Sequence, residues 1–550
     1  MTNTAPAESR TSSAVRHYPL HIGGEPVDTA ERAYGISVRA VLEPERAETI
    51  GLWRRMREGG EDEVHAHRHV LGSCALSTAE HGEAALRAAA DAAPRWLAVP
   101  LARRLAMVSV IRDRFLARRA ELGAILRAEG CPGVLVEAQF NSVLCSYDDT
   151  AFQEFHSLMY REWERGGRRL VLRRNPDGVV CVDPPFNTPL TGVFACLALV
   201  AGNTMVVRVP QSCPMSLSYA LHEIVLPALE SCGAPPGTLN ILCGDYEVHM
   251  PQWLNSPLVD SIFYFGSSEN GIALERKCLE KGKKAILELA GNDGVLVWRD
   301  ADLDRAAEAL VESFYASGQV CMVPRYVLAH PAIADDLLAR VRAAAAELRP
   351  GDPDEEHTML SPVLRTTAFF RCLGDALATG AAKVCGGERI GLDGNPDPEG
   401  LFLEPTVIRV DGLEGARELA AVREETFYPL LSVVVPEEAP DDSLLERAIT
   451  FVNGNKYGLR NSLWARDERV IDRFVASVTN GGLLKVNDSH LATVPYLSTH
   501  GGTGLSGGAH GEANYPFLRA SRLQGVAIAT EPVHPRDSLT GSAGERAGAP

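Results

Sequence analysis

The chain has 550 residues, of which 45% are hydrophobic and 23% are charged, and its formal net charge is -17 at pH 7. A chain of this length does not fold around a single core, so two or three domains are expected. The negative charge argues against nonspecific binding to nucleic acid or to an anionic membrane surface.

Cysteine usage and the apolar runs bear on the compartment. The twelve cysteines lie singly, without a C-x-x-C pair, which fits free thiols in a reducing compartment. Residues 1–16 are polar and lack the apolar core of a targeting peptide, and the longest apolar run, 189–201, is shorter than a membrane span. We therefore expect a cytoplasmic, soluble protein without membrane or nucleic-acid partners.

The N-terminal part predicts short strands followed by long helices. Residues 1–17 are expected to form a flexible tail, and 21–27 a strand, a turn and a strand. Apolar residues at helical spacing, with Arg and Glu on the opposite face, predict three helices, at 80–98, 101–130 and 152–166.

An irregular segment at 36–76 carries the alternating histidines His65, His67 and His69. Alternation would place them on one face of a strand, where three imidazoles would suit a divalent metal. A solvated edge strand or loop is the favoured interpretation, because no cysteine or carboxylate pattern completes a metal site. No metal is therefore predicted.

From residue 168 onward, short apolar strands alternate with helices. The stretch 168–183 has a period of two and is broken at 175–178, which predicts a hairpin arm followed by a core strand. Further strands are expected at 204–209, 238–243, 261–265, 295–297, 326–329, 406–410 and 431–435, and helices at 215–231, 248–254, from 271, 304–317 and 333–345. This alternation predicts an α/β fold of parallel sheets with helices on both faces, which bind ligands at the carboxyl ends of their strands.

Cys321 is the candidate nucleophile. It follows Gly318 and Gln319 at the end of an apolar-periodic segment, so it is expected on a loop. A thiol reacts only as the thiolate, and the site must therefore supply a base or a positive field. The other eleven cysteines are more simply interpreted as small buried hydrophobic residues.

Three upstream stretches end predicted strands with groups that would assist this nucleophile. Asn187 offers an amide that suits a developing oxyanion, although an Asn between prolines is more often a turn or N-cap residue. Glu288 ends an apolar strand, where desolvation would raise its pKa and fit a general base. Residues 265–271 form a small-residue turn that would let phosphate oxygens approach a helix N-terminus.

In this order, the stretches resemble the aldehyde dehydrogenase superfamily over residues 20–525. Asn187 lies in a version of the P-W-N-x-P block, Glu288 matches the glutamate of E-L-G-G, and Cys321 matches the cysteine of G-Q-x-C. The resemblance implies two Rossmann-like parallel-sheet domains plus a small β oligomerisation arm, through which homodimers or homotetramers form. The implied parts are a cofactor-binding domain at 18–155 and 178–289, a catalytic domain at 290–484, an arm at 156–177 and 485–529, and flexible tails at 1–17 and 530–550.

The resemblance also implies the reaction. The Cys321 thiolate attacks an aldehyde carbon while the Asn187 amide and the Cys321 N–H hold the oxyanion. Hydride then leaves the thiohemiacetal for the nicotinamide of NAD or NADP. Glu288 activates the water that hydrolyses the remaining thioester to a carboxylic acid.

The cofactor preference depends on two departures from the family pattern. Arg208 stands where the family usually has Lys, and Gln211 stands where NAD-preferring members often have Glu. Losing that carboxylate removes repulsion against a 2′-phosphate, and an arginine can bind one bidentately, which favours NADP over NAD. The implied cofactor-binding residues are Phe186, Arg208, Gln211, Gly266, Ser267, Glu425 and Phe427.

The implied substrate pocket contains two small residues and the two neighbours of the nucleophile. Thr188 and Ala195 are small where many members have aromatic residues, and Val320 and Met322 flank Cys321. We expect a roomy entrance that admits a bulky or branched aldehyde. Tyr428 replaces the family's glycine and adds bulk beside the nicotinamide pocket.

Two other functions stay open. A CoA-acylating or CoA-linked semialdehyde dehydrogenase would pass the acyl group to a CoA thiol, and the H-G-G-T-G-x-S-G-G form at 500–508 resembles members that oxidise semialdehydes. Glu288 argues against the acylating type, which commonly lacks that base. A degenerate binding scaffold would be favoured by loss of Cys321, Glu288 or Asn187, and all three are present.

Overall fold

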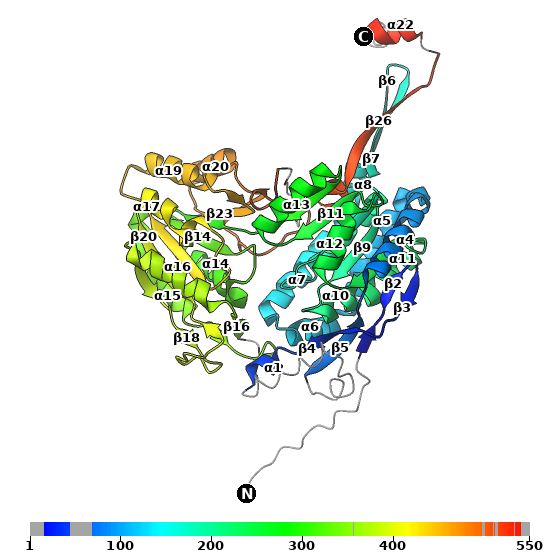
Figure 1. The fold of residues 1–550 in the computed structure, drawn as a ribbon. Coiled ribbons are helices and arrows are strands. Elements are labelled where there is room, and N and C mark those ends of the chain that lie inside the picture. Colours follow the sequence, from blue (N-terminus) through cyan, green and yellow to red (C-terminus); the bar gives the residue numbers. More distant parts are fainter. Residues whose placement is uncertain are drawn as a thin grey trace.

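Two lobes and a projecting arm make up the molecule (Figure 1). The computed structural model describes residues 16–43, 69–355, 357–497, 501–509, 511, 515–532 and 534–540. His65 and His67 lie outside these ranges, whereas His69 is buried and its Nε2 lies 2.9 Å from Glu43 Oε2. Within the described ranges, no helix combines the length and the apolar character needed to cross a bilayer.

The first lobe is built on a seven-stranded sheet in the order β12-β11-β8-β9-β10-β2-β3. The strands from β12 to β10 are parallel, and the hairpin of β2 and β3 extends the sheet in the antiparallel sense. Their bounds are β12 Lys284–Glu288, β11 Ser261–Phe265, β8 Val179–Asp183, β9 Thr204–Val209, β10 Leu239–Cys243, β2 Leu20–Ile22 and β3 Glu25–Val27.

This sheet is buried on both faces. Successive residues of one strand enter different hydrophobic cores, as Val180 and Cys181 do, because side chains alternate across a strand. The helices on one face are α4 (Ala79–Ala98), α12 (Tyr246–Asn255) and α13 (Ser268–Glu280), and those on the other include α5 (Leu101–Ala117), α6 (Arg119–Ala128), α7 (Gly133–Ser146) and α10 (Pro214–Ala220).

The second lobe repeats this plan with the order β17-β20-β21-β14-β13-β23-β24, in which the edge strand β17 is antiparallel. Its helices also cover both faces of the sheet. The bounds are β17 Ala382–Cys385, β20 Thr406–Asp411, β21 Leu430–Val435, β14 Pro324–Ala329, β13 Asp293–Val297, β23 Arg460–Trp464 and β24 Leu483–Val486, with α14 Leu303–Leu310, α15 Ala334–Ala345, α16 Thr366–Ala378, α19 Asp441–Asn453 and α20 Glu468–Ser477.

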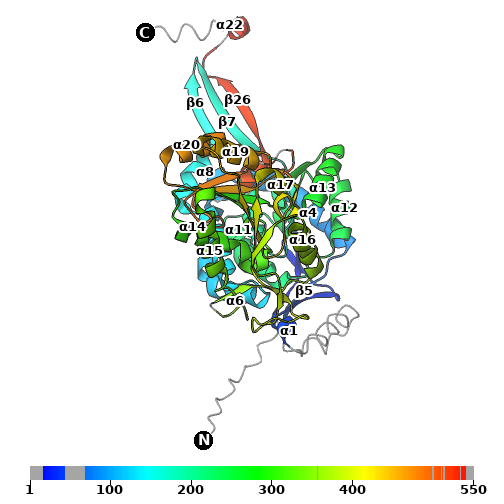
Figure 2. The ribbon, with the colours of Figure 1, turned by 90° about the vertical axis from the view of Figure 1, so that its left-hand side faces the viewer.

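The arm is an antiparallel three-stranded sheet in the order β26-β7-β6 that projects away from both lobes (Figures 1 and 2). Its strands are β6 (Tyr160–Arg165), β7 (Arg168–Pro176) and β26 (Ser521–Ala529). The helix predicted at 152–166 is therefore wrong beyond Met159, where α8 (Phe152–Met159) ends. Gly166 and Gly167 have positive φ and turn the chain, so that 160–165 pairs with β7 instead of continuing the helix.

The predicted N-terminal tail also contains structure. β1 (Arg16–Tyr18) pairs in parallel with β5 (Val70–Ala75), which in turn pairs with β4 (Arg32–Ile36). Strand pairing therefore begins at Arg16, inside the stretch expected to be a tail. Near the other end, a short helix, α22 (Pro535–Thr540), lies within the second predicted tail.

Candidate active site

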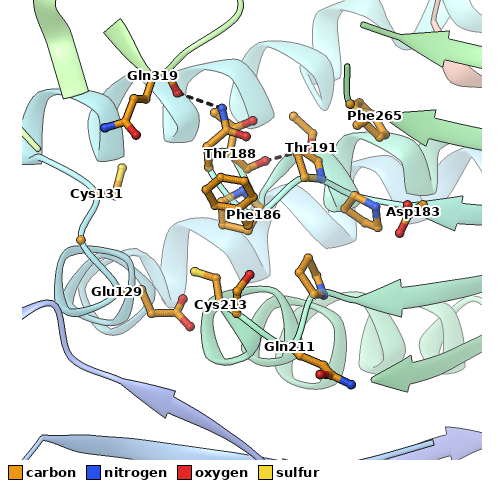
Figure 3. Close-up of a pocket in the computed structure, with 18 of the residues that line it drawn as sticks. Glu129, Cys131, Asp183, Phe186, Thr188, Thr191, Gln211, Cys213, Phe265 and Gln319 are labelled. Carbon is orange, nitrogen blue, oxygen red and sulfur yellow. Dashed lines mark hydrogen bonds between the residues drawn. The ribbon is translucent and has the colours of Figure 1, made fainter. Parts of the chain in front are cut away.

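A cavity of about 2530 Å³ lies where the carboxyl ends of first-lobe strands face the second lobe. Asp183, Phe265 and Glu288 are the last residues of β8, β11 and β12, and all three line the cavity. In Figure 3, the segment after β8 carries Phe186 and Thr188 to the side of the cavity where Gln319 lies. The cavity also gathers Asn187, Glu288 and Cys321, as expected for one reaction centre.

Cys321 follows a strained loop. The expected helix at 304–317 ends at Leu310, and Ala316, Ser317 and Gly318 have φ values of 48°, 54° and 71°. The loop is tied to the second lobe, because the Ser317 hydroxyl donates to the Ser361 carbonyl at 2.6 Å. These contacts offset backbone conformations that side-chain-bearing residues rarely adopt.

Two glycines let neighbouring backbone approach this loop. A Cβ on Gly318 would lie 2.5 Å from the Tyr428 carbonyl oxygen, and a Cβ on Gly291 would lie 2.0 Å from the Cys321 carbonyl oxygen. Gly291 follows β12 by three residues, so this close approach brings the end of Glu288's strand beside the nucleophile. The Tyr428 ring packs edge-on against Phe369, with ring centroids 5.6 Å apart.

The Cys321 thiol is half-buried and mainly protonated at neutral pH. Burial raises its pKa to about 12, and the carboxylates of Glu425, Asp293 and Glu288 act in the same direction. Arg460 acts in the opposite direction.

Asn187 joins the two lobes at the loop that precedes Cys321. Its Nδ2 donates to the carbonyl of Gln319 at 3.0 Å, and the Gln319 side chain donates to the Pro362 carbonyl at 3.0 Å. The amide therefore contacts the carbonyl of a residue that precedes Cys321 by two positions. A side-chain N–H at this place can donate to an oxygen on a carbon bonded to the Cys321 sulfur.

Glu288 is buried at the end of β12 and forms an ion pair with the buried Arg519. Burial raises the pKa of its carboxyl, while Arg519 and, less strongly, Arg460 lower it. Sequence reasoning missed Arg519. It lies 231 residues from Glu288 and outside every quoted motif, so the local sequence does not indicate the contact.

The turn that follows β11 leads into a helix at the edge of the cavity. A Cβ on Gly266 would lie 2.4 Å from the Tyr264 hydroxyl oxygen, so the glycine keeps the turn flat against the strand. Ser267 accepts a hydrogen bond from Asn270 N at 3.3 Å and begins the 13-residue helix α13, whose N-terminus faces the cavity. Phe186 is 58% exposed on the cavity wall, where its ring offers an apolar face.

Arg208 lines the same wall, but the guanidinium that was expected to bind a phosphate bidentately is already bound to groups of the protein. Its Nε donates to Asp183 Oδ1 at 2.6 Å, its Nη2 also contacts that carboxylate, and its Nη1 donates to the Gly244 carbonyl at 2.9 Å. The pair is well buried, with side-chain exposures of 12% and 5%. A phosphate could therefore use this guanidinium only by sharing it with Asp183 or replacing Asp183.

The remaining expected residues divide into two groups. Gln211, Glu425 and Phe427 line the cavity, as do Thr188 and Met322. The Glu425 carboxylate accepts a hydrogen bond from Gly291 N at 2.9 Å. Ala195 is fully buried in the first-lobe core and Val320 is 2% exposed beneath the loop, so neither reaches the cavity surface.

Known proteins share this fold. The family model described as the aldehyde dehydrogenase family matches residues 56–523, which is most of the chain. The chain therefore belongs to the aldehyde dehydrogenase family and is an NAD(P)-dependent oxidoreductase. This agrees with the resemblance seen in the motifs around Asn187, Glu288 and Cys321.

Individual relatives are distant and align over about three quarters of the chain. The NADP(+) succinate-semialdehyde dehydrogenase GabD of Escherichia coli (strain K12) is 29% identical over 432 residues, or 77% of this chain and 85% of GabD. A glutarate-semialdehyde dehydrogenase of Pseudomonas putida is 28% identical over 428 residues, or 76% of this chain and 84% of that protein.

The same fold occurs in solved structures. An NAD-dependent aldehyde dehydrogenase from Sinorhizobium meliloti aligns with a TM-score of 0.77 at 23% identity, covering 95% of this chain and 96% of that one. A 1-pyrroline-5-carboxylate dehydrogenase from Thermus, solved with bound NAD, aligns with a TM-score of 0.74 at 24% identity, covering 94% and 93%.

Proposed function

We propose that Cys321 is the nucleophile of a hydrolytic aldehyde dehydrogenase, with Asn187 as oxyanion donor and Glu288 as general base. The observation that carries this proposal is the contact of the Asn187 amide with the nucleophile loop, 3.0 Å from the Gln319 carbonyl, in the cavity that Glu288 also lines. Cys131 and Cys213 also line the cavity, but Asn187 contacts the loop that leads to Cys321.

The chain's own groups account for the covalent steps. The Cys321 proton passes to solvent, and the sulfur of the resulting thiolate bonds to the aldehyde carbon as the carbonyl π bond breaks. The carbonyl oxygen becomes an oxyanion held by the Asn187 amide and the Cys321 N–H. When bound, NAD or NADP supplies the hydride acceptor for this centre. Glu288 then takes a proton from water as the water oxygen attacks the thioester, and release of the Cys321 sulfur leaves a carboxylic acid.

The cofactor-binding residues would divide their tasks along the cavity. Gly266 and Ser267 at the start of α13 would receive the phosphates, and Phe186 and Gln211 would form the wall beside the adenosine half. Arg208 would meet the adenosine ribose. Glu425 would bind the nicotinamide ribose, and Phe427 would pack near the nicotinamide.

NADP is the cofactor that we propose over NAD. Gln211 brings no carboxylate to the wall, and the relative GabD is named for NADP. The Asp183–Arg208 ion pair weakens this preference, because the guanidinium is not free. Comparing the two cofactors directly therefore belongs to the first experiment.

The substrate proposed is a bulky or branched aldehyde. Thr188 and Met322 lie at the cavity surface, and an apolar group that includes Leu135 and Leu459 packs around the nucleophile loop. A strong preference for acetaldehyde would contradict this proposal.

The assembly and location are further proposals. We propose that 18–155 with 178–289 binds the cofactor, that 290–484 carries the nucleophile, and that the arm joins subunits into a dimer or tetramer. The outer strands of the arm sheet leave edges that a second copy could pair with. The twelve cysteines without disulfides support a cytoplasmic location.

The deciding experiment follows the rise of reduced nicotinamide absorbance with aliphatic, aromatic and semialdehyde substrates, each with NAD and with NADP. Turnover in the wild-type protein that disappears in Cys321→Ala supports the proposal. Product formation that requires added CoA would instead support the acylating alternative. Cofactor binding without turnover on any substrate would support the binding scaffold.

A further inference from the structure

The proposed base is anchored by a second buried charge. Nη1 of Arg519 donates to Glu288 Oε1, and Nη2 donates to the Leu287 carbonyl at 2.8 Å. The guanidinium carbon lies 5.3 Å from the centroid of the Phe263 ring. The side chains of Arg519 and Glu288 are 5% and 7% exposed, so the pair is removed from solvent.

The backbone that carries Arg519 is held as well. Arg519 ends the short helix α21 (Pro516–Arg519), and its carbonyl accepts a hydrogen bond from Lys284 Nζ at 2.9 Å. Asn203 Nδ2 donates to the next carbonyl, that of Ala520, at 2.9 Å. Arg519 is therefore a fixed group and not a mobile surface arginine.

We propose that Arg519 is a positioning residue for Glu288, which it holds ionised at the end of β12 so that the second carboxylate oxygen can take the proton from water. Within the described residues, no hydrogen bond is found to Glu288 Oε2, whereas Oε1 is taken by the guanidinium. This inference rests on the proposed function, in which Glu288 serves the hydrolytic step. Arg519 would then set the rate and the pH range of hydrolysis without touching acylation.

The charges around Glu288 determine the sign of the pH effect. The groups that face it are Arg519 from α21, Arg460 from β23 and the thiol of Cys321. Burial raises the pKa of the carboxyl and Arg519 is the first group opposing it, so removing Arg519 raises that pKa further. The protonated, inactive acid would then persist to a higher pH, and hydrolysis would fail earlier as the pH falls.

An activated ester separates the two half-reactions without a cofactor or a known aldehyde. The Cys321 sulfur takes the acetyl group of p-nitrophenyl acetate and p-nitrophenolate leaves, after which water hydrolyses the thioester to acetate and restores the thiol. The burst of p-nitrophenolate reports acylation, and the steady rate that follows reports hydrolysis.

We expect Arg519→Met to keep the burst but to lower the steady rate about tenfold at neutral pH. The pH below which the steady rate falls should be about one pH unit higher than in the wild-type protein. Arg519→Lys keeps the charge, so the pH at which its steady rate falls should lie closer to that of the wild-type protein. Arg522→Met is the matched control, because Arg522 is exposed and donates to the Pro176 carbonyl at 3.3 Å, outside the cavity. Its burst, steady rate and pH profile should match the wild type.

An Arg519→Met protein with a wild-type steady rate and pH profile would overturn the inference. Loss of the burst together with the steady rate would overturn it too, since the arginine would then support the whole site. If Arg519→Met does not fold, Arg519→Gln, which keeps a donor for the Leu287 carbonyl, replaces it under the same criteria. The proposed function itself would be rejected if the wild-type protein gives no burst, or if its burst persists in Cys321→Ala.

Discussion

The buried arginines on the two sides of the cavity have different partners. On the first-lobe side, each carboxylate at a strand end is matched by an arginine in direct contact, Asp183 by Arg208 and Glu288 by Arg519. On the nucleophile side, the buried Arg325 and Arg460 donate to backbone carbonyls. Among the described residues, Arg325 Nε and Nη1 and Arg460 Nη2 have no hydrogen-bond partner.

This difference separates two electrostatic tasks. Direct ion pairs fix the position of a carboxylate and cancel most of its field. A guanidinium that contacts only dipoles keeps its charge available over several ångströms in a buried site, and Arg460 thereby offsets part of the effect of the Glu425, Asp293 and Glu288 carboxylates on Cys321. The first arrangement suits a base that must stay in one place, and the second suits a sulfur and an oxygen that become negative during the reaction.

The largest effect is expected where the two sides meet. Asn187→Ala removes the amide that reaches the nucleophile loop, and turnover should fall about 10²- to 10³-fold because one oxyanion donor is lost. Steady-state kinetics with the best aldehyde would measure this. Asn255→Ala is the control, since that exposed amide donates to the Pro251 carbonyl at 2.8 Å away from the cavity. Turnover within about twofold of wild type in Asn187→Ala would exclude the oxyanion role.

Displacing the loop should have the next largest effect. Gly291→Ala would place a Cβ 2.0 Å from the Cys321 carbonyl oxygen, so the loop must shift, and a misplacement of about 1 Å can reduce turnover about 10²-fold. Gly374→Ala is the matched control, because a Cβ there meets no atom within 4 Å. Equal turnover of the two variants would show that the approach of the two lobes does not position Cys321.

The field of Arg460 should appear in the reactivity of Cys321. Because the thiol's pKa is about 12, the thiolate fraction and the rate of alkylation by iodoacetamide should rise about tenfold per pH unit between pH 7 and 10. Arg460→Met removes a cation that lowers this pKa, so the rate should drop about tenfold. Arg460→Lys should retain most of the rate.

Mass spectrometry of the peptide that contains Cys321 distinguishes it from the other cysteines. Arg466→Met is a control on the surface, where the side chain is 69% exposed. An unchanged alkylation rate in Arg460→Met would show that this guanidinium does not act on the sulfur.

The smallest effect is expected from opening the Asp183–Arg208 pair. Asp183→Asn removes a negative charge beside the proposed 2′-phosphate and frees the guanidinium, so the ratio of kcat/KM for NADP to that for NAD should rise about three- to tenfold. Asp335→Asn, whose partner Arg409 lies outside the cavity, is the control. A ratio that falls would show that Arg208 does not meet the phosphate.

Buried strands were the easiest elements to predict. The bounds expected for β9 and β11 are those of the structure, because continuous apolar runs are buried on both faces of a parallel sheet. β6 was missed, because its pairing with β7 is a contact that the local pattern of 152–166 does not express. The loop before Cys321 likewise broke an expected helix through left-handed residues held by Ser361.

Within the site, the residues with motif positions could be named in advance, and their partners could not. Asn187, Glu288 and Cys321 line one cavity as expected. Arg519 and Asp183 meet the candidate residues only through tertiary packing, because no spacing along the chain relates them. Ala195 faces the core because its place in α9 (Thr191–Ala195) puts it on the buried side, which composition alone does not reveal.

The location of Arg519 connects the arm to the proposed hydrolytic step as well as to the proposed assembly of subunits. β26 begins two residues after Arg519, and all nine of its residues pair with β7. Ala520 and Ser521, which connect Arg519 to β26, are both buried, and the Ala520 carbonyl accepts a hydrogen bond from Asn203. Substitutions that weaken the pairing of β26 with β7 should therefore loosen Arg519 and slow hydrolysis of the thioester more than its formation.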